Sequence, residues 1–412
     1  MSRDELSVSE GVPVSGTGSQ DAEVARVLDE YLADLEAGRP ADPDRLLAEH
    51  PAIASQLRTC LEVMHLAGRV ADVHGAGLDG EDEPRPGPQL ADYRIVRPIG
   101  RGGMGIVYEA EQLSLRRRVA LKVLPLAAAI DPRTLRRFQI EAQAAAQLHH
   151  THIVPVYAVG CERGVHYYAM QYIEGRTLAE LIRELRQLEG RDASEAAPTV
   201  ALSGDRELAG LLVSGPLAPP ERPPAADATA PARTPATGAT RSPGSSTRTS
   251  AYFRTVANLG IQAAEALDHA HQEGVLHRDI KPANLMVDIK GQLWITDFGL
   301  ARLQNDSGLT LSGDLVGTIR YMSPEQAAGR PAVVDQRTDI YALGVTLYEL
   351  LTLEPALVGQ DRAELLRRIM LEDPRPPQRL NPAVPRDLET IVLKAMAKGP
   401  AERYATDRKS VV

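Results

Sequence analysis

The chain has 412 residues, of which 43% are hydrophobic, and its formal net charge is -9. This length allows two or three domains, or one large domain with extensions. The negative balance argues against a general nucleic-acid-binding surface and against binding to an anionic membrane. The two cysteines, Cys60 and Cys161, form neither a disulfide framework nor a zinc pattern, so a reducing compartment is expected. The N-terminal residues lack the apolar core of a signal peptide, and no apolar run approaches the roughly 18 residues of a membrane span.

The N-terminal part of the chain changes character twice before residue 93. Residues 1–20 are rich in Ser, Gly and acidic residues and are predicted to be disordered. Residues 21–68 predict a small helical extension of three short helices, with Asp42 as N-cap and Pro43 in the first turn of the second helix. This extension either packs on another part of the chain or docks a regulatory partner, and both interpretations stay open. Residues 69–92 are interpreted as a linker.

A glycine-rich motif follows, with Gly100, Gly102 and Gly105 at the spacing G-x-G-x-x-G. The same spacing occurs in dinucleotide-binding folds, where the glycines open a helix. Here the run 106–110 follows, and its alternating β-branched residues predict a strand. The motif is therefore interpreted as a hairpin whose backbone N–H groups close over phosphates, although a glycine-rich turn without a ligand has the same local pattern.

A lysine stands inside the next apolar strand, in the run VALK that ends at Lys122. A lysine there is costly to bury unless it is paired, and a helix further along the chain carries Glu141. An ion pair between Lys122 and Glu141 would hold the ammonium group toward phosphate oxygens. A lone lysine more often extends its charge to the surface, so this pair depends on the motifs that follow.

Residues 190–250 interrupt the pattern with a stretch rich in Pro, Ala, Ser and Thr. This insert cannot bury enough apolar surface to offset the entropy of ordering, so we predict that it is disordered. Its short apolar piece at 208–213 is able to form a transient helix. After Tyr252 a helical pattern runs almost to the end of the chain, and the run 340–353 predicts a buried helix.

The run VLHRDIKPANLMV at 275–287 places a group of polar residues between apolar ends, namely His277, Arg278, Asp279, Lys281 and Asn284. The motifs that follow it are Asp297-Phe-Gly299, Gly317-Thr318, Ser323-Pro-Glu325 and the DIYALG that begins at Asp339. In this order, and after the glycine motif and Lys122, they resemble the eukaryotic-type (Hanks-type) protein kinase family, and its bacterial serine/threonine branch closely. The resemblance covers residues 93–406, interrupted by the insert.

The resemblance implies an α+β class protein with the bilobal protein-kinase fold. Residues 93–173 would form the small lobe, with an antiparallel sheet and one helix, and the hinge. Residues 251–406 would form the larger, mainly helical lobe, with ATP in the cleft between the lobes. The protein kinase domain would thus span residues 93–406.

The resemblance also implies roles for individual residues. Asp279 would accept or orient the proton of the substrate hydroxyl, and Lys281 would neutralise the transferring phosphoryl group. The other residues of the catalytic set are Lys122, Glu141 and Thr318. Asn284 and Asp297 would hold Mg²⁺, with Mn²⁺ as an alternative ion, because hard oxygen ligands suit such ions. The residues assigned to ATP binding are Gly100, Arg101, Gly102, Gly103, Met104, Gly105, Val107, Ala120, Lys122, Met170, Gln171, Tyr172 and Met286. The residues assigned structural roles are Arg278, Glu325, Asp339 and Arg403, with Glu325 expected to pair with Arg403.

The function implied is transfer of the γ-phosphate of ATP to Ser and Thr hydroxyls of proteins, in bacterial signal transduction. Lys281 and the Gly317-Thr318 pair match the serine/threonine branch of the family rather than the tyrosine branch. The alternative is a catalytically silent pseudokinase that acts as a docking scaffold. Pseudokinases usually lose one of three residues that this chain keeps, which are Lys122, Asp279 and Asp297.

Autophosphorylation is expected in the segment before Gly317, with Thr310 and Ser312 as candidate phosphosites. A phosphate there adds about -1.5 to -2 charge and would order the segment by pairing with Arg278. The expected partners are ATP, protein substrates with Ser or Thr acceptors, and a second copy of the chain for phosphorylation in trans, without nucleic acid. The kinase domain is expected to be cytoplasmic.

Two clusters of polar residues have ordinary structural interpretations. His149, His150 and His152 lack further ligands at a metal-site spacing and are assigned to the turn after the helix that carries Glu141. The basic run at 116–118 is interpreted as a solvated turn between two strands.

Residues 407–412 are interpreted as a sequence artefact or a truncated end. The family has a further helix after the Arg403 motif, and these residues lack its apolar face. Without that helix, apolar surface near Ile391, Leu393 and Met396 is expected to be exposed. A parent protein with a further C-terminal part would be free to carry a membrane anchor there.

Overall fold

The computed structural model describes residues 26–27, 31, 42–54, 57–58, 61, 89–102, 105–124, 132–162, 165–190, 250–298, 319–329 and 334–406. The chain divides into two compact units, one made of residues 1–139 and 156–172 and the other of residues 140–155 and 173–412. The predictions for residues 1–20 and 407–412, and for the insert between Gly190 and Ser250, lie outside the described residues.

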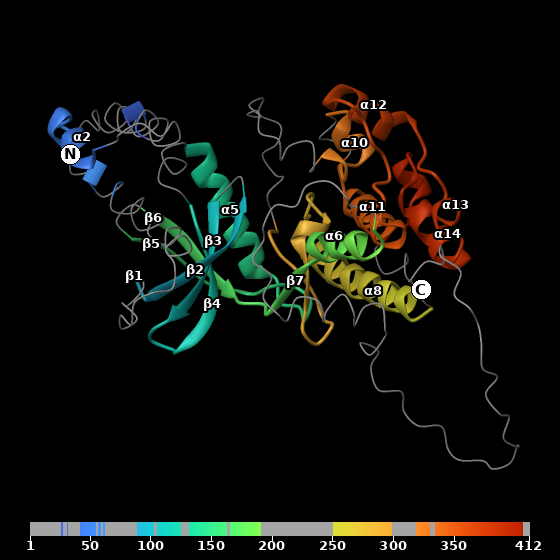
Figure 1. Cartoon of the computed structure of the whole chain (residues 1–412), viewed down its shortest axis with the longest axis horizontal. Helices are drawn as coiled ribbons and strands as arrows, with labels where there is room; N and C mark the ends of the chain where they lie inside the picture. The colour runs from blue at the N-terminus through green and yellow to red at the C-terminus, as the bar shows by residue number, and fades with distance from the viewer. Residues whose placement is uncertain are drawn as a thin grey trace, which may run out of the picture. The chain divides into compact units, whose positions relative to one another are not determined.

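The first unit contains an antiparallel sheet of six strands in the order β1-β2-β3-β4-β6-β5 (Figure 1). The strands are β1 (Gln89–Leu90), β2 (Tyr93–Gly102), β3 (Gly105–Gln112), β4 (Arg117–Val123), β5 (Val156–Glu162) and β6 (Val165–Gln171). The predicted linker at 69–92 therefore ends earlier than expected, because Gln89 and Leu90 already pair with β2. The expected antiparallel sheet is confirmed.

One face of this sheet packs into a hydrophobic core, because alternate residues of each strand point to the same side. Tyr108, Leu121 and Ala169 occupy neighbouring positions in three strands and are all buried. The opposite face carries Tyr168, whose ring centroid lies 5.1 Å from that of Phe138 on helix α5 (Pro132–Gln147). The sheet is thus packed on both faces in its central strands.

The basic run at 116–118 differs from the prediction. Only Arg116 lies in the turn, where its φ is 49°, and the next two arginines begin β4. The guanidinium of Arg117 lies 3.8 Å from the centroid of the Tyr157 ring, and that of Arg118 lies 4.9 Å from the centroid of Tyr172. These cation–π contacts allow a charged pair of residues to extend the strand.

The N-terminal extension is described at a limited number of positions. Helix α2 (Pro43–Glu49) begins as predicted, since the Asp42 side chain accepts a hydrogen bond of 3.0 Å from the Asp44 backbone N–H. Of the two helices predicted on either side of α2, the structure describes only scattered positions, most of them helical. The buried apolar residues of the extension are Val27, Tyr31, Ile53, Leu57 and Leu61.

The second unit is mainly helical, as predicted (Figure 1). Its helices within the described ranges are α6 (Leu178–Leu188), α8 (Ser250–Gln272), α10 (Pro324–Ala327), α11 (Arg337–Thr352), α12 (Arg362–Leu371), α13 (Pro377–Leu380) and α14 (Arg386–Ala395). A small antiparallel sheet has the order β7-β8-β9, formed by β7 (Gly175–Thr177), β8 (Leu285–Asp288) and β9 (Leu293–Ile295). The segment that carries Asp279 lies between α8 and β8.

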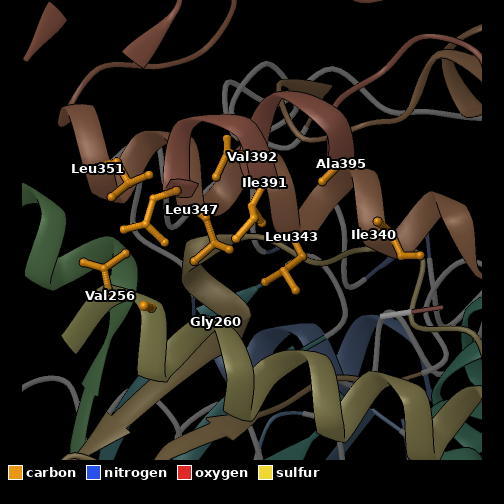
Figure 2. Close-up of a pocket in the computed structure, with 12 residues that line it drawn as sticks. Val256, Gly260, Ile340, Leu343, Leu347, Leu351, Ile391, Val392 and Ala395 are labelled. Carbon is orange, nitrogen blue, oxygen red and sulfur yellow. The ribbon is translucent and has the colours of Figure 1, made fainter. Parts of the chain in front are cut away.

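Helix α11 is the buried helix predicted at 340–353, and it packs against α8 and α14. The three helices line an apolar groove, to which Val256, Leu343 and Ile391 contribute (Figure 2). The expectation of exposed apolar surface is wrong for Met396, which is only 1% exposed. Ile391 and Leu393 are partly exposed.

No helix in the described parts of the chain combines the length and the apolar character needed to cross a membrane.

Candidate active site

The segment that leads to Asp279 is fixed by a buried histidine. The Nε2 atom of His277 lies 2.9 Å from the carbonyl oxygen of Thr296, so this nitrogen carries the proton. Its Nδ1 accepts a hydrogen bond of 3.3 Å from the backbone N–H of Asp279. The His277 ring also lies 4.7 Å from the ring of Phe298, measured between centroids. The imidazole thereby joins the candidate catalytic segment, residues 275–284, to the residues after β9.

A second anchor of this segment is Asp339, at the start of α11. Its carboxylate accepts backbone N–H groups of His277 at 2.9 Å and Arg278 at 2.6 Å, and the Nε2–H of His271 at 2.8 Å. Burial by itself raises the pKa of Asp339, but the hydrogen bond and charge of His271, with the His277 contacts, hold that pKa below its usual value. The contacts hold Arg278 at a φ of 64°, a conformation that costs energy in residues with a side chain.

The carboxylate of Asp279 is oriented through one of its two oxygens. Its Oδ2 lies 2.9 Å from the ammonium of Lys281 and accepts a hydrogen bond of 3.2 Å from the amide of Asn284. The same amide donates to the Asp279 carbonyl oxygen at 2.8 Å. Within the described ranges the other carboxylate oxygen, Oδ1, has no hydrogen-bond partner. The segment therefore holds one carboxylate oxygen in place and leaves the other available as an acceptor, on a partly exposed side chain.

The oxygen donors expected to hold a metal lie at one end of the β8–β9 hairpin. Leu285 pairs with Ile295, and the Thr296 N–H donates to the Asn284 carbonyl oxygen at 3.0 Å. This register places Asn284, just before β8, beside the residues that precede Asp297. The Asn284 amide nitrogen is used by Asp279, which leaves its amide oxygen as the ligand atom. One carboxylate and one amide oxygen fit a hard divalent cation that takes its remaining ligands from phosphates and water.

In the described part of the chain, no group of three or more His, Cys, Asp or Glu side chains is placed so that the protein alone could hold a metal ion.

The expected turn at 149–152 follows α5, and its histidines make ring contacts. The centroid of His150 lies 5.5 Å from that of His152 and 5.3 Å from that of His269 on α8.

In the first unit, the residues expected at the nucleotide share one face of the sheet. Val107 pairs with Lys122, and Ala120 pairs with Met170. Directly paired residues point to the same side, and so do residues two apart on one strand. Val107, Ala120, Lys122 and Met170 therefore lie on a common face, which is the face opposite the Leu121 core.

The glycine motif forms the predicted hairpin, with β2 pairing to β3 from Gly100 opposite Val107 to Gly102 opposite Gly105. Gly105 has a φ of 149°, and an added Cβ would lie 2.3 Å from the Val123 carbonyl oxygen, so only glycine fits there. An added Cβ at Gly100 would meet Val107 at an ordinary 3.8 Å. The two remaining motif residues, Gly103 and Met104, lie outside the described residues, as does the Arg101 side chain.

The lysine and glutamate of the expected ion pair are both buried. Lys122 is 5% exposed, and its Nζ lies 5.8 Å from the ring centroid of Tyr168. Glu141 is 0% exposed on α5. The two residues belong to different compact units, so their pairing stays a prediction.

The remaining expected nucleotide residues have separate places in the two units. Gln171 ends β6, and the hydroxyl of Tyr172 accepts a hydrogen bond of 3.5 Å from Arg97. Met286 lies in β8 opposite Trp294 and is partly exposed, between two buried neighbours. Thr318, Thr310 and Ser312 lie outside the described residues.

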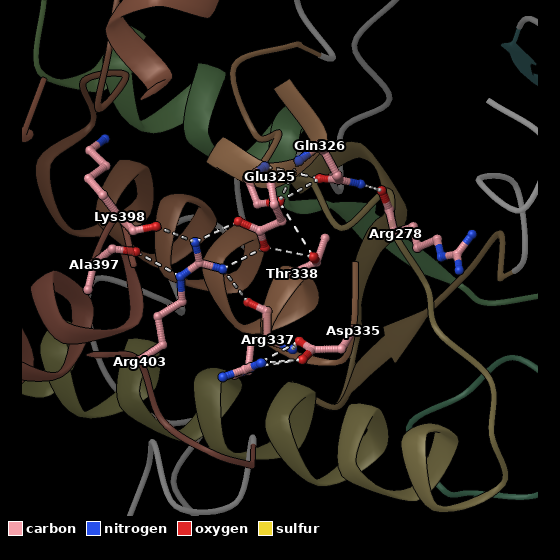
Figure 3. A network of polar contacts seen from close by, with 10 residues as sticks. Arg278, Glu325, Gln326, Asp335, Arg337, Thr338, Ala397, Lys398 and Arg403 are labelled. Carbon is pink, nitrogen blue, oxygen red and sulfur yellow. Dashed lines mark hydrogen bonds and ion pairs between the residues drawn. The ribbon is translucent and has the colours of Figure 1, made fainter. Parts of the chain in front are cut away.

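The predicted pair of Glu325 and Arg403 is present and buried (Figure 3). Both guanidinium nitrogens Nη1 and Nη2 donate to the carboxylate, each at 2.8 Å, and the Thr338 hydroxyl donates to it at 2.8 Å. Burial raises the pKa of Glu325, but the Arg403 contacts outweigh burial and keep that pKa below its usual value. The next residue, Gln326, donates its side-chain amide to the Arg278 carbonyl oxygen at 2.9 Å. The ion pair is thereby linked to the catalytic segment.

Comparison with known proteins decides the family. The model of the family described as "Protein tyrosine and serine/threonine kinase" matches residues 93–408. The chain belongs to the protein kinase family.

Its relatives include kinases named for serine and threonine. The chain is 35% identical over 315 residues to serine/threonine-protein kinase PrkC of Bacillus subtilis, covering 76% of this chain and 38% of that kinase. It is 33% identical over 320 residues to serine/threonine-protein kinase PknB of Mycolicibacterium smegmatis, covering 76% of this chain and 41% of that kinase. The chain thus spans about two fifths of the length of these curated relatives.

A solved structure has a similar fold. The kinase domain of Mycobacterium tuberculosis PknI is 25% identical, with a TM-score of 0.50, over 80% of this chain and 97% of that one. The expected class of fold, an antiparallel-sheet lobe plus a helical lobe, is confirmed. Protein kinases use ATP and a divalent metal.

Sequence reasoning missed several residues that position the site of this kinase. It named Asp339 but not its partner His271, and it named Arg278 but not Gln326, which binds its carbonyl oxygen. These contacts connect segments far apart in the chain, so no local spacing marks them. The only signal in the sequence was the type of each residue. His271 is a histidine at the end of a helix, and Gln326 is an amide shortly after the N-cap Ser323.

A third missed group surrounds Glu349 of α11. The Tyr321 hydroxyl donates to Glu349 at 2.5 Å, and Arg186 of α6 forms an ion pair with it at 2.8 Å. Burial, reinforced by the Glu349 charge, raises the pKa of Tyr321, so its hydroxyl remains a donor. This group ties the segment before α10 to two helices of the kinase.

Proposed function

We propose that this chain transfers the γ-phosphate of ATP to Ser and Thr hydroxyls of proteins, in bacterial signal transduction. The proposal rests mainly on how the carboxylate of Asp279 is held. Its Oδ2 is held by Lys281 and Asn284, while Oδ1 has no hydrogen-bond partner in the described ranges. A carboxylate fixed in this way is suited to take a hydrogen bond from an acceptor hydroxyl and to receive its proton.

Phosphoryl transfer needs positioning and charge neutralisation more than covalent help. Asp279 orients the acceptor hydroxyl for attack on the γ-phosphorus. Lys281 lies 2.9 Å from Asp279, so its ammonium is close enough to the acceptor to neutralise charge on the transferring group. Thr318, in the Gly317-Thr318 pair, completes the set that holds the acceptor.

ATP is proposed to bind to residues of both units. Backbone N–H groups of the 100–105 hairpin contact its phosphates, as does Lys122, which Glu141 orients. Val107, Ala120 and Met286 contact the adenine. The other residues assigned to the nucleotide are Arg101, Met170, Gln171 and Tyr172.

The metal is proposed to be Mg²⁺, with Mn²⁺ as a substitute. Asn284 and Asp297 would hold it, because their oxygens fit a hard divalent cation. When bound, the ion neutralises phosphate charge during transfer. The chain's own task is to keep these two oxygens at one end of the β8–β9 hairpin.

Several features support Ser and Thr as acceptors. Lys281 stands two residues after Asp279, and Gly317-Thr318 precedes the Ser323-Pro-Glu325 motif. PrkC and PknB are both named serine/threonine-protein kinases. The scaffold alternative has less support, because Lys122, Asp279 and Asp297 are all present. The kinase domain is proposed to act in the cytoplasm, where ATP and protein substrates are available.

The test is incubation of the purified chain with labelled ATP, a divalent metal and a generic protein acceptor, followed by phosphosite mapping. We expect label on Ser and Thr, and no transfer when a chelator removes the metal. Label confined to Tyr would overturn the acceptor assignment. Full ATP binding without any transfer would instead favour a scaffold.

A further inference from the structure

A single arginine stands on a rigid turn close to the catalytic segment. Arg320 lies in the turn 319–322, which closes with a hydrogen bond of 3.1 Å from the Met322 N–H to the Ile319 carbonyl oxygen. The Ile319 side chain is buried in a cluster with residues of α12. On the other side of Arg320, the Tyr321 hydroxyl is held by Glu349. The backbone that carries Arg320 is therefore fixed from both sides.

The guanidinium of Arg320 has no counter-ion among the described residues. The side chain is half-buried, and its Nε is buried without a hydrogen-bond partner. The carboxylates that contact this part of the chain are already committed. Glu349 binds Tyr321 and Arg186, and Glu325 binds Arg403. The cation has therefore no intramolecular anion within the described ranges.

A partly buried cation without a partner is unfavourable, because burial removes hydration that nothing replaces. An arginine retained in such a position is suited to an anion that binds from outside. Its planar fork matches a carboxylate or a phosphate, and such charge-assisted contacts are stronger than neutral hydrogen bonds.

The turn that bears Arg320 is directly joined to the catalytic segment. Ser323 follows the turn and is the N-cap of α10. On α10, Gln326 donates to the carbonyl oxygen of Arg278, the residue before Asp279. A peptide whose hydroxyl reaches Asp279 is therefore expected to pass near this turn and its positive charge.

We propose that Arg320 is a specificity-determining residue, which selects substrates with an anionic side chain, a carboxylate or a phosphate, near the acceptor hydroxyl. This inference rests on the proposed function and adds a substrate class to it. Arg320 acts on the choice of peptide rather than on the transfer itself, so peptides without a nearby anion are phosphorylated independently of it.

The first experiment is a position-scanning peptide array, in which Glu is placed at each position around a central Ser. The best acidic peptide and its Gln counterpart are then compared by kcat/KM with wild type, Arg320→Gln and Arg320→Glu. Loss of one charge-assisted contact is expected to lower kcat/KM for the acidic peptide by about tenfold in Arg320→Gln. The Gln peptide should be unaffected, and Arg320→Glu should disfavour the acidic peptide further.

The matched control is Arg254→Gln on α8, which removes an exposed arginine from the same unit. It should leave the acidic preference unchanged. Turnover of the Gln peptide reports that Arg320→Gln is folded and active. An equal loss on both peptides, or no preference for acidic peptides in wild type, would overturn the inference while leaving the proposed function intact. Absence of transfer to any peptide would instead contradict the proposed function and this inference together.

The same anion chemistry could come from the chain itself, through a phosphorylated Ser or Thr in the segment before Gly317. Treating the kinase with a phosphatase before the assay separates the two sources. If Arg320 binds substrate, its preference for the acidic peptide persists after treatment. If the effect of Arg320→Gln disappears after treatment, Arg320 binds an internal phosphate and the substrate assignment is wrong.

Discussion

Glu325 and Arg403 are joined by two hydrogen bonds of 2.8 Å, although they stand 78 positions apart in the sequence. The planar guanidinium matches the carboxylate with two parallel bonds, and both side chains are almost fully buried. Because Gln326 follows Glu325 and binds the Arg278 carbonyl oxygen, the pair also supports the segment that carries Asp279. Its loss should thus affect both stability and activity.

Breaking this pair is expected to be costly. Glu325→Gln or Arg403→Met leaves one buried charge uncompensated, which should lower the free energy of unfolding by about 3–5 kcal/mol. The control is Arg367→Gln, which removes an exposed pair with Glu372 and should change stability by less than about 1 kcal/mol. Urea unfolding monitored by circular dichroism measures both. Equal effects of the buried and the exposed substitutions would show that the buried pair has no special role.

The same pair predicts a pH dependence. The pKa of Glu325 is lower in the folded protein than its usual value, so the folded state binds this proton less well than the unfolded chain. The stabilisation is therefore fully present above the unfolded pKa and is lost as pH falls through the folded pKa. The difference in unfolding free energy between wild type and Glu325→Gln should shrink in acid. A difference that stays constant down to the acid range would be inconsistent with an ionised Glu325.

A small residue is required where α11 crosses α14. An added Cβ at Gly344 would lie 2.9 Å from the Ala395 Cβ, which cannot move aside without shifting its helix. At Gly260 on α8 the nearest atom is the flexible end of Leu347, at 3.2 Å. Gly344→Ala should destabilise by about 1–3 kcal/mol through overpacking. Gly260→Ala should stay within about 1 kcal/mol of wild type, because alanine favours helix. Thermal unfolding of the two variants would contradict this ranking if Gly260→Ala were the more damaging.

The elements with strong local patterns could be predicted from the sequence. The strand after Gly105 was visible in alternating residues, and the buried helix α11 in a long, mainly apolar run. The N-cap at Asp42 was visible in the following proline. The Glu325–Arg403 pair was predictable only through the family resemblance, because nothing local connects residues so far apart.

The remaining contacts depend on tertiary structure. His271 binds Asp339 across 68 residues, and neither residue type nor spacing indicates this partner. The start of β4 was misplaced because charged residues usually mark turns. Arg117 and Arg118 nevertheless extend the strand, since Tyr157 and Tyr172 supply aromatic faces for their guanidinium groups. Such compensation comes from residues that are distant in the sequence.

Autophosphorylation is expected between Asp297 and Glu325, with Thr310 and Ser312 as the main sites. A phosphate there would be suited to pair with Arg278, whose backbone is fixed by Asp339. Mass spectrometry of kinase incubated with ATP should find phosphate in this segment, and Thr310→Ala with Ser312→Ala should lower the rate of substrate phosphorylation. If two copies react in trans, the initial rate per molecule should rise with kinase concentration. Active kinase without phosphate in this segment would refute the expectation.

Substitution of Lys122 tests the proposed ATP-binding residues separately from Asp279, which is proposed to act on the acceptor hydroxyl. Lys122→Met should abolish transfer, because the buried ammonium that we assign to the phosphates is lost. Asp279 is assigned to the acceptor, so Asp279→Asn should instead leave ATP affinity close to wild type. Titration with a fluorescent ATP analogue measures the ATP affinity of each of the two variants. A large loss of ATP affinity in Asp279→Asn would contradict the assignment of Asp279 to the acceptor.

The most direct test of the proposed kinase activity is the rate of label transfer from ATP to a protein Ser or Thr by wild type, Asp279→Asn and Asp387→Asn. The control residue Asp387 is an exposed acid in the first turn of α14. We expect wild type and Asp387→Asn to transfer phosphate at similar rates, and Asp279→Asn to lose nearly all activity while remaining folded. Wild-type rates in a folded Asp279→Asn protein would show that this carboxylate does not act on the acceptor hydroxyl.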